Sequence, residues 1–375
     1  VIETWNMKFD RRLFFNFDWT LLLLVLAISF ISLINIYSAG YTIGDFKQDT
    51  LYIKQAQWII MGLFCMGIII CIDYRFISRF AYIIYAVSII LLLMVYLYGY
   101  ATHGSQRWIV IGGFSLQPSE LVKLSMILAL ARYFDNNTLD KTYTLRELSL
   151  PFLIVLLPFL FIIKQPDLGT ALILLILFLS ITLFVGVKWR SFLAAAISTI
   201  IVAPVGWFFL KEYQKERILT LFDPERDPLG TGYHIIQSII AIGSGGIFGK
   251  GYMKGTQTQL KFLPVQQTDF VFSVFAEEWG FLGALVLMIL FLTLIMWCLK
   301  TALQSRDSIG MLISFGVTML LFWEVFINIG MVLGLLPVVG IPLPLFSYGG
   351  SSMVVLMTAI GLVMNVSMRR YILQP

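Results

Sequence analysis

Charged side chains are scarce in this chain of 375 residues. Only 13% of the residues are Asp, Glu, Lys or Arg and 59% are hydrophobic, whereas a soluble domain carries about 25% charged residues. This shortage excludes an ordinary water-soluble enzyme and indicates a protein that crosses a membrane several times. The net charge of +5 is ordinary for a membrane protein with basic cytoplasmic loops. We therefore expect a lipid bilayer as partner, and no nucleic acid.

Cysteine and histidine are also rare. The three cysteines, Cys65, Cys71 and Cys298, lie inside apolar segments and offer neither a disulfide framework nor metal-ligand spacing. His103 and His234 are too few and too far apart in the sequence to suggest a metal site. The sequence therefore predicts no resident metal or cofactor, although it leaves open a divalent cation that assists catalysis.

Long apolar runs dominate the chain instead. A helix needs roughly 20 mostly apolar residues to cross a bilayer, and on that basis we predict about ten spans. They are residues 17–38, 55–72, 80–98, 119–134, 148–164, 168–187, 191–210, 279–299, 308–330 and 347–367. We expect an all-α polytopic membrane protein in which residues 17–370 form one membrane domain. Residues 1–16 and 371–375 are the expected tails, and residues 1–6 the expected remnant before a natural start at Met7.

Lysine and arginine predict the direction in which the chain crosses the membrane. With a cytoplasmic N-terminus, about 14 basic residues of the tails and short loops fall on the cytoplasmic side and about 4 on the other. We therefore expect both termini in the cytoplasm and the large loop, residues 211–278, on the outer face of the inner (plasma) membrane. Within this loop, residues 211–222 are expected to extend the seventh span. Residues 233–242 are too short to span and are expected to lie in the interface or to re-enter the membrane.

The large loop combines a glycine-rich run, residues 243–251, with basic residues and one carboxylate. Lys250, Lys254 and Lys261 precede Asp269, and no other acid lies between Pro228 and Asp269. Nucleotide-activated sugars are cytoplasmic, so a transferase on the outer face would use a polyprenyl-diphosphate-linked sugar. Its acceptor hydroxyl needs a base, and the departing diphosphate needs cationic or dipolar groups.

Asp269 can supply the base, and the lysines or the amides of the glycine run can supply the stabilising groups. Two structural alternatives stand beside this hypothesis. Asp269 can instead cap a helix that starts at Phe270, a position that aspartate favours. The glycine run can be a flexible turn.

Other ionisable residues fall within or beside the predicted spans. Glu120 and Lys123 are three apart and can form an ion pair on one helix face, and Glu324 lies near the middle of the ninth span. Intramembrane charges indicate function by default, but a purely structural ion pair explains the first two equally well. Asp167 follows Pro166 and is expected to cap the sixth span.

Several stretches together resemble one family, the shape, elongation, division and sporulation (SEDS) proteins RodA, FtsW and SpoVE. The stretches are Arg107-Trp108, residues 117–120, 165–170, 243–246, 262–264 and 268–270, Glu277-Glu278, and residues 328–352. The match runs from Phe14 to Arg370, and the motifs look more like RodA than FtsW. One departure is visible, since the family usually has a Glu and a His where this chain has Val265-Gln266-Gln267.

The resemblance implies a peptidoglycan glycosyltransferase that polymerises lipid II during cell elongation, with a class B penicillin-binding transpeptidase as partner. It implies that Asp269 is the essential acid. The predicted substrate-binding residues are Arg107, Trp108, Gln117, Glu120 and Lys123, together with the loop lysines Lys250, Lys254 and Lys261. Two rival functions are a lipid II flippase, with intramembrane charges lining a polar path, and a non-catalytic scaffold for the transpeptidase.

Overall fold

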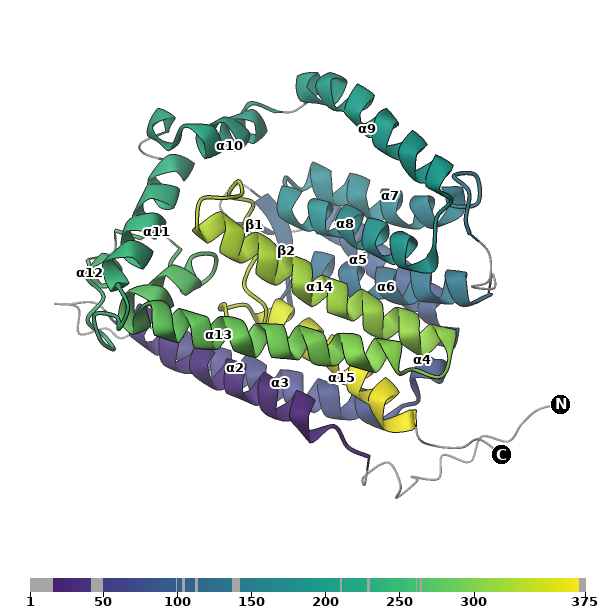
Figure 1. Cartoon of the computed structure of the whole chain (residues 1–375), viewed down its shortest axis with the longest axis horizontal. Coiled ribbons are helices and arrows are strands. Elements are labelled where there is room, and N and C mark those ends of the chain that lie inside the picture. The colour runs from purple at the N-terminus through teal and green to yellow at the C-terminus, as the bar shows by residue number, and fades with distance from the viewer. Residues whose placement is uncertain are drawn as a thin grey trace.

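The computed structural model describes residues 16–41, 50–98, 100–102, 105–111, 114–136, 142–209, 211–227, 230–260, 262–263 and 265–370. Most of these residues are helical (Figure 1). The helices of the first half are α2 (Trp19–Ala39), α3 (Leu51–Cys71), α4 (Tyr74–Arg79), α5 (Ala81–Tyr98), α6 (Pro118–Asn136), α7 (Ser149–Lys164) and α8 (Leu168–Val185). Those of the second half are α9 (Trp189–Phe209), α10 (Glu212–Phe222), η1 (Pro224–Arg226), α11 (Thr231–Gly245), α12 (Thr256–Gln259), α13 (Val271–Leu303), α14 (Ser308–Val332) and α15 (Gly350–Arg369).

Each of the predicted spans coincides with one helix, which confirms a mostly helical, multi-pass membrane protein. Among the described helices, six are long and apolar enough to cross a membrane by length and composition, namely α2, α3, α8, α13, α14 and α15. The exact number of crossings therefore stays a prediction. Most residues of α14 and α15 are buried, so these two helices form the centre of the bundle.

A small sheet that the sequence analysis did not anticipate precedes α6. Strands β1 (Tyr100–Thr102), β2 (Ser105–Ile111) and β3 (Phe114–Leu116) pair antiparallel in the order β1-β2-β3. The run from Trp108 to Ile111 is aromatic and β-branched, which suits a strand, and it is far too short to cross a bilayer. The sheet fixes the two residues of the Arg107-Trp108 motif directly before α6.

The large loop differs from the expectation at both of its ends. Residues 211–222 do not extend the seventh span, because Lys211 has an extended backbone (φ −69°, ψ 154°) and α10 begins as a separate helix. At the other end α13 begins at Val271, before the predicted start at residue 279. Gly280 then interrupts α13 with φ 65° and ψ −165°, a conformation that is accessible mainly to glycine.

The glycine-rich run packs against this interruption. The amides of Lys250 and Gly251 donate to the carbonyls of Glu277 and Glu278, each at 3.0 Å. A Cβ atom on Gly249 would lie only 2.1 Å from the carbonyl oxygen of Glu278. The run is therefore neither a flexible turn nor a diphosphate cradle, because glycine is needed for a close backbone approach and these two amides are already bonded.

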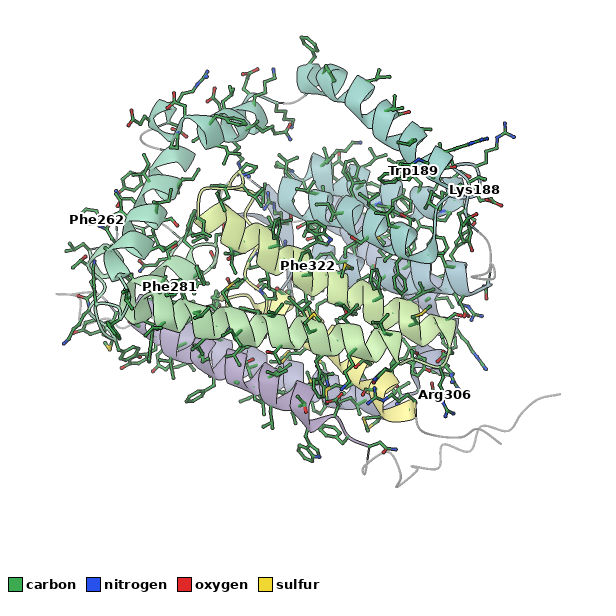
Figure 2. The ribbon with its side chains drawn as sticks, viewed as in Figure 1. Lys188, Trp189, Phe262, Phe281, Arg306 and Phe322 are labelled. Carbon is green, nitrogen blue, oxygen red and sulfur yellow. The ribbon has the colours of Figure 1, made fainter. Side chains whose placement is uncertain are left out.

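The molecule has two distinct ends. The end of α15 lies at the lower right in Figure 1 and the start of α2 at the bottom, whereas α11 and α12 lie on the left and α9 and α10 arch along the upper edge. Figure 2 shows Lys188 and Arg306 towards the first end and Phe262, from the large loop, at the second. The two basic residues, both predicted to be cytoplasmic, thus lie far from the loop predicted to be external.

Candidate active site

A cavity of about 330 Å³ opens where the sheet, α6, the large loop and the α14–α15 connection meet. Its lining includes residues from β2, α6, α8, α10 and the segment before α13. Six of the predicted site residues lie in this lining: Arg107, Trp108, Gln117, Glu120, Lys123 and Asp269. The fold thus gathers at one place residues that are widely separated in the sequence.

Asp269 is half-buried in this cavity and does not cap α13. The N-cap position of α13 is Phe270, and no side chain makes a capping hydrogen bond there. The capping alternative is therefore wrong, and the carboxyl group of Asp269 is left to face the cavity. Burial raises the pKa of Asp269 above its ordinary value, while a hydrogen bond with Thr268 and the positive charges of Arg217 and Arg107 oppose this rise.

A glycine keeps the space beside this carboxyl group open. Gly340 has φ 74°, and a Cβ atom there would lie 3.5 Å from Oδ2 of Asp269. A side chain at this position would strain the backbone and occupy the cavity. The segment that contains Gly340 is non-helical, as the prolines of residues 336–344 predict.

Arg107 is held at the cavity by three contacts of its guanidinium group. Its Nε donates to the carbonyl of Gln165 at 3.3 Å, its Nη2 donates to the carbonyl of Pro166, and its Nη1 lies 3.8 Å from Oδ1 of Asp167. Asp167 also caps α8, as predicted, and accepts from the amide of Thr170 at 3.3 Å. These contacts fix a guanidinium group at the cavity before any substrate arrives.

The predicted ion pair on α6 is confirmed and has a third member. Nζ of Lys123 lies 2.9 Å from Oε2 of Glu120 and 2.5 Å from Oε1 of Glu324 on α14. All three side chains are buried, and Glu120 and Lys123 also line the cavity. The Lys123–Glu324 contact thus links α6 to α14, while Glu120 and Lys123 form a charged part of the cavity lining.

The loop lysines lie elsewhere. Nζ of Lys250 donates to the fully buried carboxylate of Glu277 at 2.7 Å and to Oγ1 of Thr256 at 2.7 Å. Lys254 is exposed, and neither lysine lines the cavity. Lys261 lies outside the described residues. Substrate binding by these lysines stays a prediction without support from the geometry.

The sequence analysis missed Arg217, which reaches the cavity from α10. It treated residues 211–222 as a continuation of a membrane span, so the charged residues of this segment were not considered as candidate site residues. The available signal was a set of basic residues on a helix with apolar neighbours, which is typical of a helix lying at the membrane surface. Thr268, Tyr348 and Ser352 also line the cavity and were not selected.

A metal site is not apparent among the described residues, where no group of three or more His, Cys, Asp or Glu side chains could hold an ion. Asp167 and Asp269 are the acids of the cavity that come from outside α6. A divalent cation could gain two carboxylates there, but no preformed ligand set surrounds it. The cation stays an open prediction.

The fold and the cavity define a polytopic membrane protein with a charged site beside a large loop. A model of the FtsW/RodA/SpoVE family, described as cell cycle proteins, matches residues 18–372. The chain is 42% identical over 360 residues to the peptidoglycan glycosyltransferase MrdB of Escherichia coli (strain K12), which covers 96% of this chain and 95% of that protein.

Solved structures agree with this match. A chain of a peptidoglycan synthase complex that coordinates polymerization and crosslinking superposes with a TM-score of 0.81 at 33% identity, covering 95% of this chain and 98% of the other. The rod shape determining protein RodA of Thermus thermophilus superposes with a TM-score of 0.70 at 30% identity and the same coverage. The chain belongs to the FtsW/RodA/SpoVE family, and the resemblance seen in the sequence is confirmed.

Proposed function

We propose that this chain is a peptidoglycan glycosyltransferase that polymerises lipid II, the undecaprenyl-diphosphate-linked disaccharide peptide, on the outer face of the inner (plasma) membrane. Its family membership and the name of its Escherichia coli relative support this function. The observation that carries the proposal is the carboxyl group of Asp269, half-buried in a cavity that Arg107 and Arg217 also line. The same site serves cell elongation and the maintenance of cell shape.

Asp269 acts as the general base of this reaction. It accepts the proton of the 4-hydroxyl of the acceptor's N-acetylglucosamine, and that oxygen attacks the anomeric carbon of the donor's N-acetylmuramic acid. The bond from this carbon to the diphosphate oxygen breaks, and undecaprenyl diphosphate leaves with the electron pair. The configuration at this anomeric carbon is inverted. The raised pKa of Asp269 makes its carboxylate a stronger base than an exposed aspartate.

Cationic groups of the cavity stabilise the departing diphosphate. Arg107 and Arg217 line the cavity together with Asp269 and act on it as positive charges, whereas the charge of Lys123 is already compensated by Glu120 and Glu324. A guanidinium group that is fixed before the reaction stabilises developing negative charge without reorganising, and Arg107 is fixed in this way by two carbonyls and one carboxylate. Trp108 and Gln117 contact the sugar portion of the substrate.

Two further observations support the proposed partner and the proposed orientation. The similar chain in the peptidoglycan synthase complex supports a transpeptidase partner, which we assign to the class B penicillin-binding proteins. The bias of Lys and Arg supports cytoplasmic termini. With that orientation, the end carrying Lys188 and Arg306 in Figure 2 faces the cytoplasm.

Polymerisation of lipid II by purified protein with its partner tests the proposal. Asp269→Asn keeps the size of the side chain but removes the proton acceptor, so glycan strands should not form. Glu212→Gln, the same acid-to-amide change at an exposed position outside the cavity lining, is the matched control and should polymerise normally. Full activity of Asp269→Asn would refute the role of this residue as general base.

A lipid II flippase is the second candidate, and the buried Glu120–Lys123–Glu324 cluster favours it, because intramembrane charges often line transport paths. Liposomes that contain the protein separate the two functions. A flippase moves labelled headgroups across the bilayer without forming polymer, whereas the proposed enzyme forms polymer from lipid II supplied on the outer side alone. A scaffold would do neither.

A further inference from the structure

The main chain directly before α13 is held from one side by three hydrogen bonds. The carbonyls of residues 267, 268 and 269 are consecutive, and each accepts a different donor. Tyr348 N donates to the first at 2.9 Å, Ser347 Oγ to the second at 2.6 Å, and Asn328 Nδ2 to the third at 3.0 Å. These donors come from α14 and from the segment between α14 and α15, which is remote in the sequence.

Further hydrogen bonds fix the orientation of the two side-chain donors, Ser347 and Asn328. The hydroxyl of Ser347 accepts from the amide of Leu343 at 2.8 Å, so its own proton points to the carbonyl of Thr268. Asn328 is fully buried and donates its second N–H to the carbonyl of Ile341 at 2.7 Å. Each donor therefore joins the main chain at Asp269 to the non-helical segment that carries Gly340.

This segment is itself secured to the rest of the bundle. Gln55 on α3 donates to the carbonyl of Ser347 at 3.1 Å, and Ser32 on α2 donates to the carbonyl of Phe346 at 2.6 Å. Ser351 Oγ accepts from the amide of Gln117, a residue of the cavity lining, at 3.0 Å. Residues 343–351 therefore connect the main chain at Asp269 with the wall that carries Gln117.

We propose that Ser347 and Asn328 are positioning residues for Asp269. They hold the peptide units of residues 268 and 269 so that the carboxyl group, which no helix cap engages, points into the cavity. The inference rests on the proposed function for its kinetic consequence but not for its structural one. Because a catalytic group must stay within a fraction of an ångström of its productive place, losing one of these bonds lowers kcat while leaving substrate contacts intact.

The kinetic test compares three serine variants of the full chain with its partner, using initial rates of lipid II polymerisation. Ser347→Ala removes the donor, and we expect kcat to fall about tenfold to a hundredfold with an unchanged KM, as a displacement of about 1 Å can cost 100-fold. Ser347→Thr keeps a hydroxyl and should restore most of the rate. Ser32→Ala is the matched control, because it loosens the same segment from α2 without touching residues 267–269.

A second readout does not depend on turnover. Coupling of a water-soluble carbodiimide and an amine to Asp269, followed by peptide mass spectrometry across a pH range, reports the titration of its carboxyl group. Ser347→Ala and Asn328→Ala should shift this profile to lower pH, since the carboxyl group leaves the buried surroundings that raise its pKa, while Ser32→Ala should not. A loss of kcat together with this shift supports positioning when thermal melts show that the variant is folded at the assay temperature, because a folded protein of lower stability keeps its carboxyl groups in place.

The outcomes separate the two proposals. If the wild-type protein labels normally at Asp269 but forms no polymer, the proposed function fails, and the labelling profiles still decide the role of Ser347. If the wild type forms polymer and Ser347→Ala matches it in kcat and in labelling, the positioning role is refuted. Equal losses of kcat in Ser347→Ala and Ser32→Ala, with no shift in labelling, would also refute it.

Discussion

Asp269 and Glu277 lie close together in the sequence but in opposite environments. Glu277 is fully buried and accepts from Lys250 Nζ at 2.7 Å, Gln257 N at 3.0 Å and Thr258 Oγ1 at 3.1 Å. Asp269 faces a cavity, and the helix that follows it takes no cap from its side chain. A carboxylate whose oxygens are fully engaged holds the structure together, whereas one left open to a cavity is available for chemistry.

The largest effect we expect is the loss of rate in Asp269→Asn. Removing a general base costs about 10²–10⁴-fold in kcat. Thermal stability at neutral pH should not fall, because burial raises the pKa of Asp269 and its ionised form therefore costs folded-state stability above that pKa. Polymerisation kinetics and a thermal melt of the same preparation measure both. A large drop in melting temperature would mean that Asp269, like Glu277, is structural.

Arg217→Ala should give the next largest effect. A lost hydrogen bond to a charged group costs about 1.5–3 kcal/mol, which corresponds to roughly 10–100-fold in kcat/KM for lipid II. The control is Arg226→Ala, since Arg226 is exposed and its Nε lies 3.8 Å from Glu216 Oε2 outside the cavity. Equal kinetics for the two variants would remove Arg217 from the site.

Glu277→Ala should have the opposite profile from Asp269→Asn. The buried donors of residues 257 and 258 lose their acceptor, and we expect destabilisation of about 1–3 kcal/mol. Polymerisation per folded molecule should change far less than in Asp269→Asn. Thermal melts in detergent, followed by rate measurements at a temperature where the variant is folded, test this contrast. An active-site role for Glu277 would appear as a loss of kcat without a loss of stability.

The smallest effect is a displaced pH profile. With Asp269 as the proposed general base, its carboxylate is the active form, so kcat/KM should rise as the pH rises through its pKa. Because burial raises this pKa, the midpoint should lie above the ordinary aspartate value of about 3.9. Arg217→Lys, which keeps the charge, should leave the midpoint nearly unchanged, whereas Arg217→Gln should raise it further. A midpoint at the ordinary value would contradict the burial of the base.

Much of the fold could be predicted from the sequence, because apolar length alone marks a membrane helix. The boundaries failed where conformation depends on a distant partner. The break at Gly280 is stabilised by residues 246–251. The hydrophobic periodicity of α13 cannot predict this break, because it depends on contacts with a different segment. The sheet before α6 was missed because its strands are short and lie between two spans.

The candidate site was predicted unevenly. Arg107 was selected because it belongs to the Arg107-Trp108 motif, and Asp269 because it is an isolated acid in the large loop. Both residues line the cavity. The glycine-rich run was misread, since composition cannot tell a ligand-binding backbone from one that packs against another backbone. Arg217, Ser347 and Asn328 were missed as site or positioning residues because their roles depend on which segments meet in space.

The contact between the glycine-rich run and α13 also orders events during synthesis. Residues 246–251 leave the ribosome before residues 277–282. The amides of Lys250 and Gly251 therefore have no partner until the carbonyls of Glu277 and Glu278 have been synthesised. Until the two meet, the broken turn at Gly280 exposes backbone groups that lipid cannot satisfy. The second half of the bundle must therefore assemble as a unit, in which residues 246–251 and α13 complete each other's hydrogen bonds.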